Sequence, residues 1–156
     1  MDLHYSGTER IPVPRDKVWA FITDPKSVGS CLPDVIDYTA VDDHNVNATV
    51  KVAVGPVRGT FKFQIQLQPS ADGNHVGMNI GGGGFGSVVN LVAGADVSSD
   101  GDVTVLDWQG DATMRGPVAT VGGRVLDAQA NRVITQTFAN VKSRLVGESA
   151  APAPAG

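Results

Sequence analysis

The residues with the most evident chemical potential are Gly81 to Gly86, where five glycines surround Phe85. Glycine-rich turns bind phosphate through backbone N–H groups, but a P-loop also needs a Gly-Lys-Ser/Thr sequence that opens a helix. Here Ser87 and Val88 lead into another strand-like segment, and no lysine lies nearby. We therefore predict a hairpin connection, because glycine supplies the positive φ that such turns need. The alternative is a mobile gate in which Phe85 closes an apolar opening.

Other reactive side chains are few and scattered. His4, His44 and His75 fall in an edge strand, a turn and a strand start. No two of them have the helical spacing that metal ligands often show, so we predict solvent-exposed histidines. Cys31 has no predicted basic neighbour that would activate its thiol, and we interpret it as a small buried apolar residue. A single cysteine also excludes an internal disulfide.

The composition indicates one ordinary globular domain. The chain has 156 residues, of which 42% are hydrophobic and 18% are charged. The net charge of -4 argues against a general electrostatic grip on nucleic acid or on an anionic bilayer, so any membrane contact must be local or apolar. No apolar run approaches the ~20 residues of a spanning helix, and none resembles a signal peptide. We expect a cytoplasmic protein that is peripheral to the inner face of the cell membrane.

Strand periodicity dominates the chain, and it is clearest over residues 57–69. There Val57, Phe61 and Phe63 alternate with polar residues, and Gly59 interrupts the apolar face, which indicates a bend. Turn residues separate further segments of the same kind. The predicted antiparallel strands cover residues 2–11, 34–43, 45–55, 57–69, 74–84, 86–98 and 102–115. Sequential hairpins would order them as a meander.

Helical periodicity is confined to three segments. Two short helices are predicted over residues 15–23 and 26–31, each bounded by proline. One long helix is predicted over residues 117–146, with two apolar stripes that are rotated around its axis. These elements form the predicted domain, residues 1–146. Residues 147–156 have the composition of a flexible tail, either a spacer towards a membrane anchor or a frayed terminus.

Four segments carry a family resemblance: VPRDKVWAFITDP (residues 13–25), CLPDV (31–35), VGPVRGTF (54–61) and RGPVATVGGRVLD (115–127). They resemble the carbon monoxide dehydrogenase G-subunit (CoxG-like) family of the START-like, or SRPBCC, helix-grip superfamily. Asp34 stands where that family usually has glycine. The resemblance implies an α+β helix-grip fold, in which a curved seven-stranded antiparallel sheet wraps around a long C-terminal helix and two short helices follow the first strand.

The same resemblance implies a partner and a ligand class. The family is similar to lipid-binding START-like proteins and is associated with molybdenum-containing carbon monoxide dehydrogenase. Its members are thought to tether or service that enzyme at the membrane without oxidising carbon monoxide themselves. The resemblance therefore implies a START-like hydrophobic-ligand-binding domain with no catalytic activity.

The sequence also suggests where a ligand would bind. Aromatic and methionine side chains concentrate on the predicted dry faces of the strands, opposite a helix segment made mainly of small residues. Such a pairing leaves room for a ligand, although an ordinary core is the alternative. An amide on the apolar stripe needs a partner, either backbone or a ligand carbonyl. The predicted ligand-binding residues are Val52, Val54, Phe61, Phe63, Met78, Ile80, Phe85, Leu91, Leu106, Trp108, Met114, Val118, Val121, Val125 and Gln129.

A membrane quinone, such as menaquinone or ubiquinone, is the most economical ligand. A soluble dehydrogenase must pass its electrons to a membrane acceptor, and an apolar cavity with a polar handle suits a quinone. We expect no covalently bound cofactor, no metal and no nucleic-acid partner. The alternatives are a ligand-free scaffold or membrane recruitment factor for the dehydrogenase, and a START-like enzyme such as a cyclase or hydrolase. The lack of an acid–base pair on the dry faces ranks the enzyme last.

Overall fold

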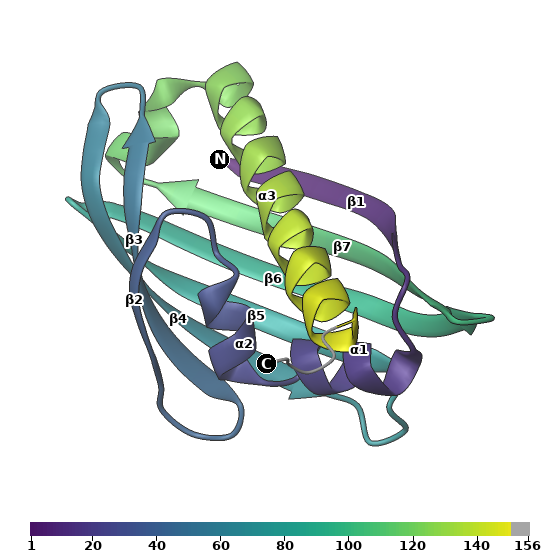
Figure 1. Ribbon diagram of the computed structural model, residues 1–156. Helices are drawn as coiled ribbons and strands as arrows, with labels where there is room; N and C mark the ends of the chain where they lie inside the picture. Colours follow the sequence, from purple (N-terminus) through teal and green to yellow (C-terminus); the bar gives the residue numbers. More distant parts are fainter. Residues whose placement is uncertain (151–156) are drawn as a thin grey trace.

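A curved antiparallel sheet of seven strands embraces one long helix in the computed structural model, which describes residues 1–150 (Figure 1). The helix crosses the concave face of the sheet, and two short helices cover the lower part of the same face. This is the predicted α+β architecture. The elements are β1 (Asp2–Ile11), α1 (Arg15–Ile22), α2 (Pro25–Ser30), β2 (Val35–Ala40), β3 (Asn45–Val54), β4 (Val57–Pro69), β5 (His75–Gly84), β6 (Ser87–Asp100), β7 (Val103–Arg115), η1 (Pro117–Val121) and α3 (Gly123–Ala150).

Strands β2 to β7 form the predicted meander, and β1 pairs with β7 at the edge opposite β2. The order across the sheet is β1-β7-β6-β5-β4-β3-β2, with Asp2 opposite Thr113. In an antiparallel meander, alternate turns lie at opposite ends of the sheet. The β3–β4 and β5–β6 turns therefore share one end with the β7–η1 junction. The β2–β3, β4–β5 and β6–β7 turns share the other end.

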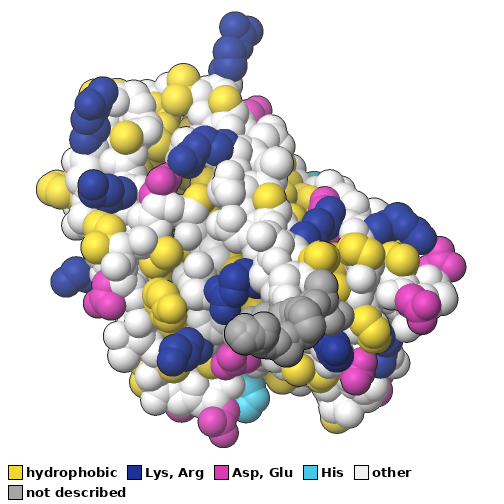
Figure 2. All heavy atoms as spheres, in the orientation of Figure 1, with side chains coloured by type: hydrophobic (Ala, Val, Ile, Leu, Met, Phe, Trp, Pro, Cys, Tyr) yellow, Lys and Arg dark blue, Asp and Glu magenta, His cyan; other side chains and the backbone are white. Residues whose placement is uncertain are grey.

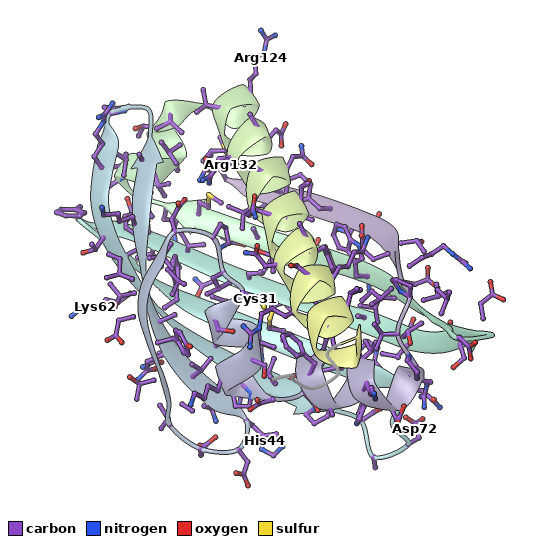
Figure 3. The ribbon with its side chains drawn as sticks, in the orientation of Figure 1. Cys31, His44, Lys62, Asp72, Arg124 and Arg132 are labelled. Carbon is purple, nitrogen blue, oxygen red and sulfur yellow. The ribbon has the colours of Figure 1, made fainter. Side chains whose placement is uncertain are left out.

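The register places the predicted dry residues on one inner face. One row across the sheet joins Ile65, Ile80 and Leu91 as successive partners, and side chains alternate between the faces along each strand. The predicted sheet residues on this inner face are Val52, Val54, Phe61, Phe63, Met78, Ile80, Leu91, Leu106, Trp108 and Met114. Polar residues such as Lys62 point to the outer face (Figure 3).

The hydrophobic core is divided into three clusters. One joins α1 to the C-terminal part of α3 and contains the buried Cys31, as predicted. A second lies between α2 and strands β3 to β5, around Ile65. The third joins η1 to the start of α3 and contains Val54, Val118 and Leu126. The long helix is thus anchored in separate clusters near its two ends.

The predicted continuous helix over residues 117–146 was wrong in its first part. Residues Pro117–Val121 form a 3-10 helix, and Gly122, with a φ of 97°, separates it from α3. The break changes the helical phase, so Leu126 is only 2% exposed while the neighbouring Val125 is 43% exposed. The predicted stripe of Val118, Val121, Gly122, Val125 and Leu126 is therefore right for Val118, Val121 and Leu126, which pack in one cluster, and wrong for Val125. At its other end α3 passes the predicted limit at Val146, and the rest of the predicted tail, residues 151–156, lies outside the described residues.

The glycine run is part of a hairpin, as predicted, but its glycines serve a different purpose. Four of them belong to β5, and the turn itself is formed by Phe85 and Gly86, both with positive φ. Gly82 and Gly83 have φ values of 152° and 155°, and a Cβ on either would lie 2.0 Å from a backbone oxygen of a neighbouring strand. These two positions require glycine because the strands approach so closely. The glycines of β5 therefore allow close strand packing and do not form a flexible gate.

We predict that Gly82→Ala destabilises the protein by about 2 kcal/mol or more, because both the backbone angle and the contact with Lys62 O would have to change. Gly81→Ala is the matched control. Its Cβ would meet only the side-chain oxygen of Asn90 at 3.3 Å, and the expected cost is below about 1 kcal/mol. Urea denaturation monitored by circular dichroism measures both values. Equal stability of the two variants would show that the run is a flexible connector.

Candidate functional site

Large apolar side chains between α3 and the middle of the sheet are only partly buried. Helix α3 approaches the sheet most closely at β1 and β3, at the two sides of the curved surface. Phe63, Leu91 and Trp108 face the helix from the inner surface, yet all three are only half-buried. A close-packed core would bury such large apolar side chains completely. The inner face between the three core clusters is therefore less tightly packed than the clusters themselves.

A groove of about 570 Å³ opens from this region between α3 and the β3–β4 hairpin, and we call it the β3-side groove. Its wall is formed by Asp34, Lys51, Val52, Ala53, Gly59, Thr60, Gln129 and Arg132. The predicted polar residue Gln129 is half-buried here, and its amide makes no hydrogen bond within residues 1–150. The groove thus combines an apolar strand surface with polar side chains from α3.

An ion pair crosses the mouth of the β3-side groove. Arg132 donates from Nη2 to Asp34 Oδ2 at 2.7 Å, which joins α3 to the turn before β2 (Figure 3 shows Arg132 on the β3 side of the helix). Asp34 has a φ of 61°, a conformation that favours glycine. Its backbone oxygen accepts a hydrogen bond from Lys51 N at 2.9 Å. Asp34 therefore keeps the turn that glycine would form and adds a carboxylate that closes the mouth.

A second groove, of about 380 Å³, opens on the other side of α3, and we call it the β1-side groove. Two polar pairs join β1 to α3 across it. The Tyr5 hydroxyl donates to Asp127 Oδ1 at 2.6 Å, and Lys142 pairs with Glu9 at 2.7 Å. Burial, and then the hydrogen bond and negative charge of Asp127, raise the pKa of Tyr5 to about 12. Its phenol therefore stays protonated at neutral pH and acts as a fixed donor.

Two buried polar atoms have no partner. Within residues 1–150, these are Trp108 Nε1 on β7 and Thr137 Oγ1 on α3. Trp108 also lines the β1-side groove, where its ring packs on Phe138 with centroids 5.5 Å apart. A buried group without a hydrogen bond costs about 1–3 kcal/mol, so native proteins seldom leave one unmatched. Both atoms are therefore candidates to bind a polar group of a ligand.

The predicted ligand-binding residues occupy several environments. Val52 and Gln129 line the β3-side groove, and Trp108 lines the β1-side groove. Phe63 and Leu91 are half-buried on the inner face of β4 and β6 and line neither groove. Four other half-buried residues pack against the edges of the core clusters: Met78, Ile80, Met114 and Val121.

The remaining predicted residues do not border the grooves. Phe61, Val54, Leu106 and Val118 are buried at 7% exposure or less and belong to the packed interior. Phe85 and Val125 lie at the surface, with exposures of 64% and 43%. The sequence analysis predicts Val125 at the cavity because it assumes one continuous helix from residue 117. It predicts Phe85 there because it considers the turn as a gate over an apolar opening.

Sequence reasoning missed Asp34, Arg132 and Thr137. The ion pair joins residues that are far apart in the chain, and no local pattern announces such a pair. Thr137 follows Leu126 on the same helix face, so a helical wheel started at Gly123 would have found it.

The two histidine–aspartate pairs of the sheet lie away from the β3-side and β1-side grooves. His4 pairs with Asp111 at 2.6 Å and His75 pairs with Asp96 at 2.8 Å, both exposed on the outer face. His44 is exposed in the β2–β3 turn, so the prediction of solvent-exposed histidines is confirmed. No helix within residues 1–150 is both long enough and apolar enough to span a bilayer.

Known structures share this fold at low sequence identity. A conserved protein from Geobacillus kaustophilus has a TM-score of 0.83 and 20% identity, covering 92% of this chain and 95% of its own. The Zhui aromatase/cyclase from Streptomyces sp. R1128 has a TM-score of 0.70 and 15% identity, covering 99% and 100%. A START superfamily protein from Mycobacterium smegmatis has a TM-score of 0.68 and 13% identity, covering 91% and 96%. These likenesses establish the START-like helix-grip fold.

The sequence itself identifies the family. A comparison with curated proteins finds no significant match. The family profile for the G subunit of carbon monoxide dehydrogenase (CoxG) matches residues 7–146, a range that includes both grooves' walls on β3, β4, β7 and α3. The chain therefore belongs to the CoxG family of carbon monoxide dehydrogenase.

Proposed function

We propose that this protein is a non-enzymatic accessory protein of carbon monoxide dehydrogenase that binds a lipophilic ligand between α3 and the sheet. A membrane quinone, such as menaquinone or ubiquinone, is the proposed ligand, and the complex links the dehydrogenase to the membrane electron-transport chain. The observation that carries the proposal is the divided core, in which large apolar side chains on the inner face stay half-buried opposite α3. An apolar ligand would supply the contacts that these side chains lack.

The polar groups around the space suit a quinone. A quinone ring is flat, apolar on its faces and carries carbonyl oxygens that only accept hydrogen bonds. Trp108 Nε1 can donate one such bond, and the Thr137 hydroxyl can donate another. Gln129, at the mouth of the β3-side groove, offers a further donor. The isoprenoid tail would lie along the apolar inner face beside Phe63 and Leu91.

The charged groups favour binding over catalysis. In the β3-side groove, Asp34 and Arg132 neutralise each other at 2.7 Å. On the other side, the raised pKa of Tyr5 keeps its phenol protonated. The two histidine–aspartate pairs lie on the outer face of the sheet. An aromatase/cyclase among the structural relatives shows that the fold can host an enzyme, but these groups do not supply general acid and base catalysts to the proposed cavity.

Ligand occupancy can be tested by filling the space from the helix side. Val133 is half-buried on the same face of α3 as Leu126 and Thr137. We predict that Val133→Phe lowers the affinity for a short-chain ubiquinone about tenfold or more. The added ring would occupy empty volume, so the free energy of unfolding should change by less than about 1 kcal/mol. Quenching of tryptophan fluorescence reports binding, since Trp108 borders the space.

Val125→Phe is the matched control for this test. It makes the same substitution in the same helix, but at a position that is 43% exposed. The control should bind the quinone with the affinity of the unaltered protein. If quinone does not quench the fluorescence of the unaltered protein, or if Val133→Phe strongly lowers the free energy of unfolding, the protein is better explained as a ligand-free scaffold.

The unpartnered hydroxyl gives a second test. Thr137→Val removes an atom that has no hydrogen bond in the ligand-free protein, so stability should stay constant or rise. Quinone affinity should fall about five- to tenfold through the lost hydrogen bond. Thr104→Val is the control, because the buried Thr104 hydroxyl donates to Val13 O at 2.7 Å. This control should lose about 1–3 kcal/mol of stability. If both variants are equally destabilised, Thr137 is an ordinary structural residue.

A further inference from the structure

The two ends of the sheet differ in charge. The turns at one end contain Asp42, Asp43, Asp72, Asp100 and Asp102. Hydrogen bonds from backbone and side-chain donors lower the pKa of Asp42 and of Asp72, which keeps both charged. At the opposite end, the turns and the start of α3 bring together Arg58, Arg115 and Arg124. Arg10 pairs with Asp100 at the first end, at 2.6 Å, but the other four aspartates of the turns form no ion pair within residues 1–150. The two ends therefore differ in charge, which the net charge of -4 does not show.

The second end is assembled from segments far apart in the chain. A Cβ on Gly55 would lie 3.3 Å from Val121, so the β3–β4 turn packs on η1. The ring of Phe85 lies against Gly59, which joins the β5–β6 turn to β4. The backbone N–H of Val118 donates to Ser87 Oγ at 2.9 Å. These contacts make one continuous surface from three separate tips.

Exposed apolar side chains lie among the arginines. Phe85, Val88 and Val125 are 64%, 42% and 43% exposed, and Val88 is the strand partner of Arg115. Phe85 also has a φ of 54°, in a two-residue turn where glycine or asparagine would fit with less strain. The ring packs on Gly59 with one side and leaves most of its surface exposed. Strained and exposed apolar residues of this kind occur at functional surfaces.

The arginines are free to meet an external partner. Arg58, Arg115 and Arg124 are all exposed, and none forms an ion pair within residues 1–150. Arg124 extends outward from the start of α3 in Figure 3. Figure 2 shows dark blue and yellow side chains together over the upper part of the molecule, where few magenta side chains lie, whereas dark blue and magenta side chains are mixed towards the lower and right edges.

We propose that this surface, which we call the basic end, contacts an anionic phospholipid bilayer. It consists of Arg58, Phe85, Val88, Arg115, Arg124 and Val125. The arginines match the negative surface of such a bilayer, and the exposed aromatic and aliphatic side chains can enter its headgroup region. The acidic turns at the other end face away, because a negative bilayer repels them. Charge and apolar exposure together thus fix one orientation.

This orientation also suggests a route for the ligand, and that part of the proposal rests on the proposed function. The β3-side groove begins on the same hairpin as the basic end, since Gly59 and Thr60 line the groove and follow Arg58 directly. A protein seated in this way would present the groove mouth at the bilayer surface. An apolar ligand could then move between bilayer and groove without crossing water. Vesicle contact itself does not require a ligand.

The test measures cosedimentation of the 156-residue protein with quinone-free vesicles. One set contains phosphatidylcholine alone, and the other contains about 30 mol% phosphatidylglycerol. We expect binding only to the anionic vesicles, with most of it lost at about 0.5 M NaCl. The double variant Arg58→Glu with Arg124→Glu should lower the affinity for anionic vesicles by a factor of about 25 or more, because each basic residue near the surface contributes about fivefold.

Two matched controls separate a local surface from overall charge. Lys17→Glu with Lys26→Glu makes the same change in net charge at exposed positions on α1 and α2, and it should retain most of the binding. Phe85→Asn, which tolerates positive φ, should weaken binding. Val41→Asn, at a residue 59% exposed in the opposite end, should not.

Three outcomes would overturn the proposal. They are no binding to anionic vesicles, equal losses in both charge-reversal variants, and binding of the basic end to purified carbon monoxide dehydrogenase without vesicle binding. The last outcome would make this surface a protein interface. Failure of the quinone proposal looks different, because vesicle binding would persist while the fluorescence quenching would be absent.

Discussion

The structure depends on how α3 is held. A strongly curved sheet and a straight helix cannot stay in contact along their whole length, so apolar packing concentrates near the two ends of the helix. There, Leu126 and Leu145 are each 3% exposed or less and belong to different clusters. Between them Phe63, Leu91 and Trp108 on the inner face stay half-buried. Anchorage at two points therefore leaves the middle of the sheet less tightly packed than the two ends, at some cost in stability.

Four departures from local preference bear on the proposed binding surfaces. Asp34 and Phe85 have positive φ without being glycine, and Trp108 and Thr137 bury polar atoms without a partner. The first two lie at the groove mouth and at the basic end, and the other two lie on β7 and on α3. A chain folded only for stability would correct each of them with a single substitution. Asp34 and Trp108 line the two grooves, and Phe85 belongs to the basic end, which agrees with the binding roles proposed for these surfaces.

The sequence was sufficient for the strands because their apolar residues alternate and their turns are rich in aspartate and glycine. Val57 to Leu67 alone determine which face of β4 is buried, and pairing then carries that assignment across the sheet. The helix was harder, because one backbone angle at Gly122 shifts the phase of everything after it. Apolar periodicity contains no signal for that angle, so it places Val125 beside Leu126 in one interior stripe, although only Leu126 is buried. Long-range pairs such as Asp34 with Arg132 also leave no local pattern.

The pairing of β1 with β7 determines when the fold can form. Asp2 finds its partner Thr113 only after nearly the whole sheet has been synthesised, and α3 follows later still. Contacts between such distant positions slow folding, since a long loop must close before they are rewarded. During translation the first strand has no neighbour, and β7 emerges with an unpaired edge before it meets β1. An unpaired strand edge can pair with another chain, so the partly folded protein is prone to aggregate. The yield of folded protein in cells should therefore depend more on the supply of chaperones than on the stability of the final fold.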